Sequence, residues 1–415
     1  MNRPAPGWRM WVAPTTMMLC TLLGYIDRQV LAALSPTILS DTRMSQYEYT
    51  LAVSAFSIVY TIMNPVFGSF LDHIGLRRGM IIAVLIWTIA SVSHAGLNGL
   101  IGFALARALL GFGEGAAFPG ALRTAAEALP LNKQSRGMAL GYSGASMGAL
   151  ITPPIIIPIA QRYGWRFAFL LTGILGLLWL VLWWRVARPP FLPAQTADEQ
   201  ARRPLKIRWP DLRERRVWVV VSGFGLGGLA LGVAAYLSPL YLNRALGLSQ
   251  AQLGNILWIP MIGWEAGYFF WGWVADRFAA NEPRPVRIFV LLTILSLPTA
   301  FMTLTSSWVI AVALFTWSTF IADGFVVMSL RVGSRIFPAD RIGMVAGIGS
   351  GSWGAVQAVI QPVYGAWFDR RWYAATFISM SLLPLLGTLL WLWFSKPWAA
   401  SASADTSSTV PAARG

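Results

Sequence analysis

Long apolar runs are the feature of this chain that most constrains its fold. Runs long enough to cross a bilayer recur along the sequence, for example at residues 81–97, 167–184 and 377–394, and each crossing needs roughly 20 residues. Only 12% of the 415 residues are charged, whereas a soluble globular chain carries about 25%. The pattern predicts an all-α polytopic membrane protein.

Twelve membrane-spanning helices are predicted from these runs. The first follows Arg3 and Arg9 and continues through Asp27 to Leu39 without a convincing cleavage site, so it is expected to be a retained span and not a signal peptide. The predicted spans are 11–39, 47–71, 79–97, 99–124, 137–160, 166–188, 217–243, 250–275, 286–305, 307–331, 341–367 and 373–395.

The longest segment outside these spans, 189–216, divides them six and six. We therefore expect an N-terminal six-helix bundle at 1–188 and a C-terminal one at 217–395. Residues 189–216 would form a cytoplasmic linker, and the Ser/Ala/Thr-rich tail at 396–415 would be disordered.

The two halves repeat the same landmarks in the same order. Gly68-x3-Asp72 after the second span is echoed by Gly272-x3-Asp276 after the eighth, and Leu122-Arg123 is echoed by Leu330-Arg331. Two six-helix repeats are typical of a carrier whose halves rock about a central site.

The net charge of +15 follows from membrane topology. Of the 32 arginines and lysines, two (Arg28 and Arg107) lie at membrane depth, twenty-four fall in the tails and even-numbered loops, and six fall in odd-numbered loops. Basic loops remain on the cytoplasmic side, so both termini are predicted to be cytoplasmic, in a bacterial inner membrane. Nucleic acid is therefore not expected as a partner.

Two predicted spans each carry a pair of charged residues in their interior, where a charge normally faces a cavity or a partner. Asp27 and Arg28 are in the first span; Arg107 and Glu114 are in the fourth, seven residues apart and so on one helix face. An arginine fork fits a carboxylate bidentately, and a carboxylate in a poorly solvated cavity can carry a proton. The pattern predicts an anion site beside a proton site. The alternative is a structural Arg–Glu pair that braces the first and fourth spans.

Three further polar residues lie at membrane depth. Tyr60 could donate a hydrogen bond to a bound carboxylate or hydroxyl, or it could be an aromatic packed between helices. Glu265 and Asp323 are acids that could handle protons or serve as helix-packing partners. We assign Glu265, with Asp27 and Glu114, to proton coupling.

The turn after the second span has the pattern of a gating loop, made by Gly68, Asp72, Gly75, Arg77 and Arg78 and echoed at Asp276. Asp72 can sit at a helix N-terminus or pair with nearby arginines, which would latch one conformation. The glycines spaced by four in the fifth and eleventh spans favour close helix packing.

The sequence contains short matches to enzyme motifs, but none lies in the structural setting that its chemistry requires. The Gly-x-Ser-x-Gly at 144–148 and the glycine patterns at 111–116 and 223–228 lie inside predicted helices without a preceding strand. There is no Walker motif, His73 and His94 form no plausible metal site, and the single cysteine, Cys20, allows no disulfide. We expect no enzymatic activity, cofactor or metal.

The loop at 68–78 resembles the signature loop of the major facilitator superfamily, and four other motifs resemble its anion:cation symporter family. The four are Tyr25-Ile-Asp-Arg28, Arg107-Ala-Leu-Leu-Gly-Phe-Gly-Glu114 with Pro119, Ser143-Gly-Ala-Ser-Met-Gly148 with Pro153-Pro154, and Tyr163-Gly-Trp-Arg-Phe-Ala-Phe169. Trp258-Ile-Pro260 is most similar to the hexuronate and galactonate branches of that family. The resemblance implies that Arg28, Tyr60 and Arg107 bind the organic anion. It also implies that Asp27 and Glu114 couple protons.

The sequence departs from this family where the substrate would be chosen. Tyr142 replaces a common asparagine, and the eleventh span offers Ser350, Ser352, Trp353 and Gln357 in place of another. Tyr142, Ser352, Trp353 and Gln357 therefore join the predicted substrate site.

The sequence thus predicts a monomeric secondary transporter that carries a small organic anion with protons, the anion being a sugar acid such as a hexuronate or aldonate. One alternative is a proton-coupled exporter of drugs or metabolites with a largely apolar cavity. Another is a transporter-like nutrient sensor that binds without carrying.

Overall fold

A computed structural model describes residues 7–193, 209–278, 282, 284–337 and 342–396. These residues form helices and connections and contain no strand. The predictions for 194–208 of the linker and for 397–415 of the tail lie outside the described residues.

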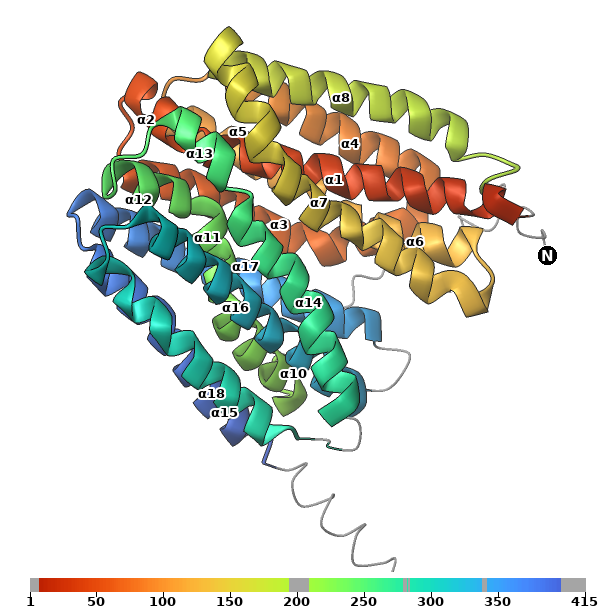
Figure 1. The fold of residues 1–415 in the computed structure, drawn as a ribbon. Helices are drawn as coiled ribbons and strands as arrows, with labels where there is room; N and C mark the ends of the chain where they lie inside the picture. The colour runs from red at the N-terminus through yellow and green to blue at the C-terminus, as the bar shows by residue number, and fades with distance from the viewer. Residues whose placement is uncertain (1–6, 194–208, 279–281, 283, 338–341, 397–415) are drawn as a thin grey trace, which may run out of the picture.

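The chain forms two helical halves that lie side by side (Figure 1). The N-half contains η1 (Gly7–Trp11), α1 (Val12–Ala33), α2 (Ser35–Thr42), α3 (Gln46–Ile74), α4 (Leu76–Ser93), η2 (His94–Gly96), α5 (Leu100–Glu114), α6 (Ala117–Ala128), α7 (Leu131–Tyr163) and α8 (Trp165–Val186). The C-half contains α10 (Arg215–Val220), η3 (Val221–Leu226), α11 (Leu229–Tyr236), α12 (Ser238–Arg244), α13 (Gln250–Ile256), α14 (Ile259–Phe278), α15 (Val286–Ser296), η4 (Leu297–Leu304), α16 (Trp308–Ile336), α17 (Ile342–Asp369) and α18 (Tyr373–Phe394).

Nine helices in the described part are long and apolar enough to cross a membrane, or ten if α1 and α2, bent by 56°, form one span. The helices α14 and α17 are long enough but are not among these. The all-α class is confirmed, while the count of twelve spans stays a prediction.

Several spans predicted as continuous are broken in the structure. The first divides at Leu34 into α1 and α2, and the seventh divides into four short segments that end with α12. Pro36 and Pro239 occupy the first turns of α2 and α12, where proline's missing N–H costs nothing. The fourth span breaks at Gly115 and the eighth near Leu257.

Turn chemistry fixes how α3 begins and ends. Ser45 and Glu48 form a reciprocal capping box at its N-terminus. Gly75, the glycine predicted to shape the gating turn, ends α3 with φ 89° and leads directly into α4. A residue with a side chain is strained at this φ, so glycine is required here.

The helices have two distinct ends. We call the end with the connections at 74–76 and 129–131 the basic end, since Arg77, Arg78 and Arg123 lie there, and the other the opposite end. Asp369 at the end of α17 accepts hydrogen bonds from the backbone N–H groups of Gln46 and Tyr47, both at 2.9 Å. Thr37 of the N-half also bonds Gln250 of the C-half at 2.9 Å. The opposite end is therefore closed.

The halves separate towards the basic end, where they diverge in Figure 1. Along α17, a methyl group added to Gly365 or Gly354 would press on Thr50 or Thr61 of α3, and at Gly351 it would lie 3.7 Å from Thr61. Nothing lies within 4 Å of such a group at Gly347 of α17. Contact between the two helices thus ends near Thr61.

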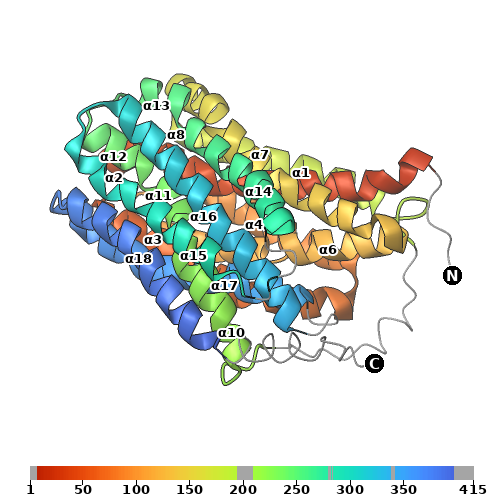
Figure 2. The same cartoon turned by 60° about the horizontal axis from the view of Figure 1, so that its bottom comes forward.

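The sequence repeat has a structural counterpart at the gating turns (Figure 2 shows both halves from the side of these turns). Asp72 lies 3.2 Å from Arg123, and Asp276 lies 3.2 Å from Arg331. Each pair joins helices of a single half, so neither bridges the two halves in this conformation.

The predicted close packing by glycines is present in α7. A side chain at Gly144 or Gly148 would collide with the backbone of α1 at Met18 or Leu22. This contact holds α1, which carries two of the buried charges, firmly within the N-half.

Candidate functional site

Arg28 of α1 is the centre of the candidate site. Its side chain is 4% exposed, and its Nε donates a hydrogen bond of 2.5 Å to Oε2 of Glu114 on α5. Because this bond uses Nε, the two terminal NH2 groups, which form the fork that binds a carboxylate, stay outside it. The pair joins the first and fourth predicted spans, as the structural alternative required.

Three aromatic rings surround the Arg28 guanidinium. Its carbon lies 4.6 Å from the ring centre of Tyr25, 4.8 Å from Phe56 and 4.4 Å from Tyr60. Each contact of this kind contributes about 0.5–2 kcal/mol when the cation is shielded from water. Tyr60 is thus beside Arg28, as a substrate-binding role requires, and it also stacks on Phe56. The rings therefore stabilise the cation at membrane depth.

The acids Glu114 and Asp27 lie in different surroundings. Glu114 is fully buried, and its second oxygen, Oε1, has no hydrogen-bond partner. Asp27 accepts a 2.6 Å hydrogen bond from Ser91, which is 2.8 Å from the hydroxyl of Thr172. Asp27 therefore faces α4 and α8 inside the N-half, and Glu114 is the acid that touches the arginine.

Arg107 of α5 does not pair with Glu114. It is 1% exposed, and its Nη2 donates to the backbone carbonyl of Arg28 at 3.1 Å, while its Nε has no partner. A buried guanidinium with an unused donor is costly unless a ligand completes it. The Arg–Glu pair that joins the first and fourth spans is therefore made by Arg28 and not by Arg107.

The C-half closes over this group at the opposite end. Tyr25 lies 5.9 Å from Trp264 of α14, ring centre to ring centre, and Tyr49 donates to the carbonyl of Tyr236 at 2.9 Å. Glu265 is half-buried on α14 next to Trp264. It therefore belongs to the C-half wall and is not joined to the Arg28–Glu114 pair.

The remaining predicted substrate residues lie on the helices around this centre. Tyr142 of α7 is 37% exposed and contacts Phe118 edge to face. On α17, Trp353 bonds the carbonyl of Gly228, Ser352 bonds its own helix, and Gln357 is fully buried between Leu229 and Gln361. In this conformation the polar groups of Ser352, Trp353 and Gln357 are all committed to protein partners.

The predicted gating residues cluster at the basic end. Gly68 lies in the last turns of α3 and faces open space, as does Gly272 of the C-half. Arg77 and Arg78 begin α4, and the Arg77 carbonyl accepts a hydrogen bond from Trp183. Asp72 is held at this end by Arg123.

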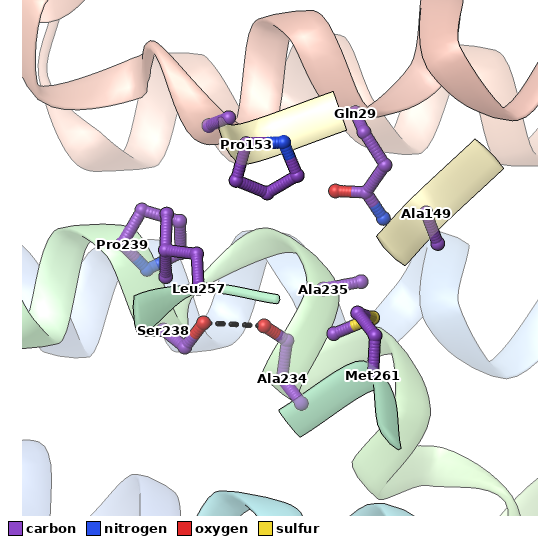
Figure 3. A pocket seen from close by; sticks show the side chains of 10 residues that line it. Gln29, Ala149, Pro153, Ala234, Ala235, Ser238, Pro239, Leu257 and Met261 are labelled. Atoms are coloured by element: carbon purple, nitrogen blue, oxygen red, sulfur yellow. Dashed lines mark hydrogen bonds between the residues drawn. The ribbon is translucent and has the colours of Figure 1, made fainter. Parts of the chain in front are cut away.

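One polar residue at the boundary between the halves was not predicted from the sequence. Gln29, next to Arg28, points between Ala149 and Pro153 towards Ala235 of the C-half (Figure 3). The small cavity there holds about one water molecule. The only available signal was an uncharged polar residue beside a buried charge.

No group of His, Cys, Asp or Glu in the described part could hold a metal ion.

Buried charges inside a two-half helical bundle define a membrane transport protein, and the comparisons give its family. The model of the Major Facilitator Superfamily matches residues 17–360, so the chain belongs to that superfamily. A bacterial homologue of the human lysosomal transporter Spinster, solved in an inward-facing and unoccupied conformation, has the same fold, with a TM-score of 0.77 and 14% identity over 95% of this chain and 98% of that one.

Curated relatives carry sugar acids. The galacturonate transporter of Dickeya chrysanthemi is 29% identical over 65% of this chain and 82% of its own length. The hexuronate transporter of Escherichia coli K12 is 25% identical over 92% of both chains, and the D-galactonate transporter of E. coli O6:H1 is 24% identical over 94% and 97%. The resemblance inferred from the motifs is confirmed, and all three of these relatives are transporters.

Proposed function

We propose that this protein is a proton-coupled symporter of a small organic anion, a sugar acid of the hexuronate or aldonate class, that works by alternating access. The observation that carries the proposal is Arg28, a buried cation whose Nε is bonded to Glu114 while its terminal fork is outside that bond. A carboxylate can be bound by two parallel N–H donors at such a fork.

The aromatic rings suit a sugar acid better than a bare anion. Tyr25, Phe56 and Tyr60 offer apolar faces around the charge, and binding sites for small molecules combine such faces with a few placed polar groups. Arg107, with its unpaired Nε, would be a second donor to the carboxylate. Gln29 and Tyr60 would meet sugar hydroxyls.

Coupling would follow from competition for Arg28. An ionised Glu114 satisfies Arg28, so the substrate must displace a carboxylate that is already bound. A proton on Glu114 removes that competitor and leaves the arginine in need of an anion, because an unpaired buried charge is strongly unfavourable. Proton and substrate therefore bind together. Asp27 and Glu265 are kept as further proton-coupling candidates.

The orientation follows from the charges of the loops. The basic end would face the cytoplasm of a bacterial inner membrane, with both termini there. The present conformation, closed at the opposite end, would then be open to the cytoplasm. In the outward-open state the gating turns with Asp72 and Asp276 would approach the other half.

Uptake into proteoliposomes tests the proposal. D-galacturonate or D-galactonate should accumulate when the outside is acidic, and a protonophore should abolish accumulation. D-galactose, which lacks the carboxylate, should not accumulate. Accumulation that ignores the proton gradient would refute the coupling.

A thermal-shift screen separates the alternative functions. Sugar acids should stabilise the purified protein while lipophilic cations should not. The reverse would favour an exporter of drugs. Saturable binding without any counterflow would favour a sensor.

A further inference from the structure

Asp323 of α16 is a buried acid that the proposed mechanism does not use. It is 0% exposed, and neither of its carboxylate oxygens has a hydrogen-bond partner. Glu114 and Asp27, by contrast, each accept at least one hydrogen bond. Buried polar groups are normally paired, so an acid with two unpaired oxygens requires an explanation.

Two polar groups close to Asp323, the Phe320 carbonyl and the Thr319 hydroxyl, bond other partners. The side chain packs against Gly267 of α14, where an added methyl group would lie 2.9 Å from Oδ2 of Asp323 and from the Phe320 carbonyl. That carbonyl accepts the indole N–H of Trp271 at 2.9 Å. Thr319 donates to the carbonyl of Pro260. The close approach of α14 thus encloses the carboxyl without bonding it.

The charges around Asp323 do not stabilise an anion. Two titratable groups of α14, Glu265 and Tyr268, interact electrostatically with Asp323, and neither can carry a positive charge. No arginine or lysine in the described part forms an ion pair with it. From α10, which also packs on α16, Arg216 bonds the Ile336 carbonyl, 13 residues and about 20 Å along the helix. The other packed segments, α11, α12 with Arg244 at its end, α15, α17, η3 and η4, bring no ion pair to Asp323 within the described residues.

An ionised Asp323 would be an unpaired charge at membrane depth, which costs several kcal/mol or more. A metal cation would not neutralise Asp323 well, because such ions need several oxygen ligands. The described residues contain no group of three His, Cys, Asp or Glu side chains that could hold a metal ion. A single bound proton removes the charge without any further ligand.

We propose that Asp323 binds a second transported proton, in the C-half and separate from Glu114. The proton is held while α14 packs against α16 through Gly267, as in the present conformation. When α14 shifts on α16 while the basic end is open to the cytoplasm, water reaches the carboxyl from that side and the proton leaves with the substrate. This inference rests on the proposed function only in that substrate moves together with protons.

The stoichiometry of transport tests this site. In proteoliposomes with the membrane potential clamped at zero, the steady-state accumulation of D-galacturonate should change by about a hundredfold per pH unit for two protons and about tenfold for one. Asp323→Asn, which keeps the shape but cannot exchange a proton, should lower the wild-type hundredfold to tenfold. Ser329→Ala is the matched control, because Ser329 is also fully buried and unpartnered on α16; it should leave the stoichiometry unchanged. The same stoichiometry in Asp323→Asn and wild type would overturn the inference, and so would accumulation that follows a sodium gradient at fixed pH.

A second measurement does not require the variant to transport. Infrared spectra of the full chain in lipid, taken as differences between pH values, report carboxylic acids that gain or lose a proton. Wild type and Ser329→Ala should show a protonated-carboxyl band that Asp323→Asn lacks. If all three spectra agree, Asp323 does not exchange a proton and the inference fails. If wild type shows no proton-driven uptake at all, the proposed function fails, while the loss of the band still reports on Asp323 alone.

Discussion

The hydrogen bonds of Asp369 should control how often the opposite end opens. Asp369 ends α17 in the C-half and accepts from the N–H groups of Gln46 and Tyr47, which begin α3 in the N-half. These N–H groups have no partner within α3, and the helix dipole favours a negative charge there. Asp369→Asn removes the charge and one of the two acceptor oxygens.

The size of the effect follows from this geometry. A hydrogen bond to a charged group contributes about 1.5–3 kcal/mol, and a charge at a helix end adds about 0.3–1 kcal/mol. Asp369 is exposed, so solvent screening reduces these values, and we expect about 1–2 kcal/mol in total. The closed state of the opposite end should therefore lose about 5–30-fold in population relative to the open state.

Distance measurements between spin labels check this expectation. Labels at Tyr163 of the N-half and Trp372 of the C-half, both more than half exposed at the opposite end, should show longer distances in Asp369→Asn, with Cys20 replaced in every labelled protein. Asp41→Asn is the matched control, because Asp41 is an exposed acid at the same end that bonds Trp165 and Arg166 within the N-half only. Equal distributions in Asp369→Asn and wild type, or an equal shift in the control, would refute the reasoning.

Three further changes test the site and the gating turn. Arg107→Lys keeps the charge but loses the fork, so sugar-acid affinity, measured by calorimetry, should fall about tenfold to a hundredfold with little change in melting temperature; unchanged affinity with a lower melting temperature would make Arg107 structural. Glu114→Gln leaves Arg28 without a counter-charge and should lower the free energy of unfolding by about 3 kcal/mol. A bound sugar acid should stabilise this variant more than it stabilises wild type, and pH-driven accumulation should disappear. Normal accumulation would mean that the proton site is another residue. Gly68→Ala should raise stability by about 0.5–1 kcal/mol, since the added methyl group meets nothing here, yet slow transport if α3 must pack closely in the other state; Gly354→Ala, which presses on Thr61, should instead destabilise the protein.

The helical class and the division into halves could be predicted because the bilayer demands long apolar segments, and these are visible in composition alone. The breaks within spans were harder to predict. Pro36 could have marked the bend after α1, but prolines also lie inside unbroken helices, as Pro65 does in α3. Whether a proline breaks a span depends on neighbouring helices that satisfy the freed backbone groups.

The buried charges could be found from sequence, but their partners could not. Spacing along one helix shows which residues share a face, and it predicted that Arg107 and Glu114 share one. It does not report which residue arrives from another helix. Arg28 reaches Glu114 because the glycines of α7 hold α1 tightly. Asp369 was missed for the same reason, since its partners are backbone groups of α3, 322 and 323 residues away.

The two halves resemble each other at the gating turns and differ at the centre of their spans. The Asp72–Arg123 and Asp276–Arg331 pairs, both at 3.2 Å, are counterparts at the gating turns, and a rocking mechanism uses both turns in the same way. At the centre, the N-half has arginines and acids together, whereas the described C-half spans carry the acids Glu265 and Asp323 without an arginine at that depth. The proposed mechanism therefore places the anion on the N-half. It gives the C-half acids a cationic cargo, and the proton is the cation whose binding needs no other ligand.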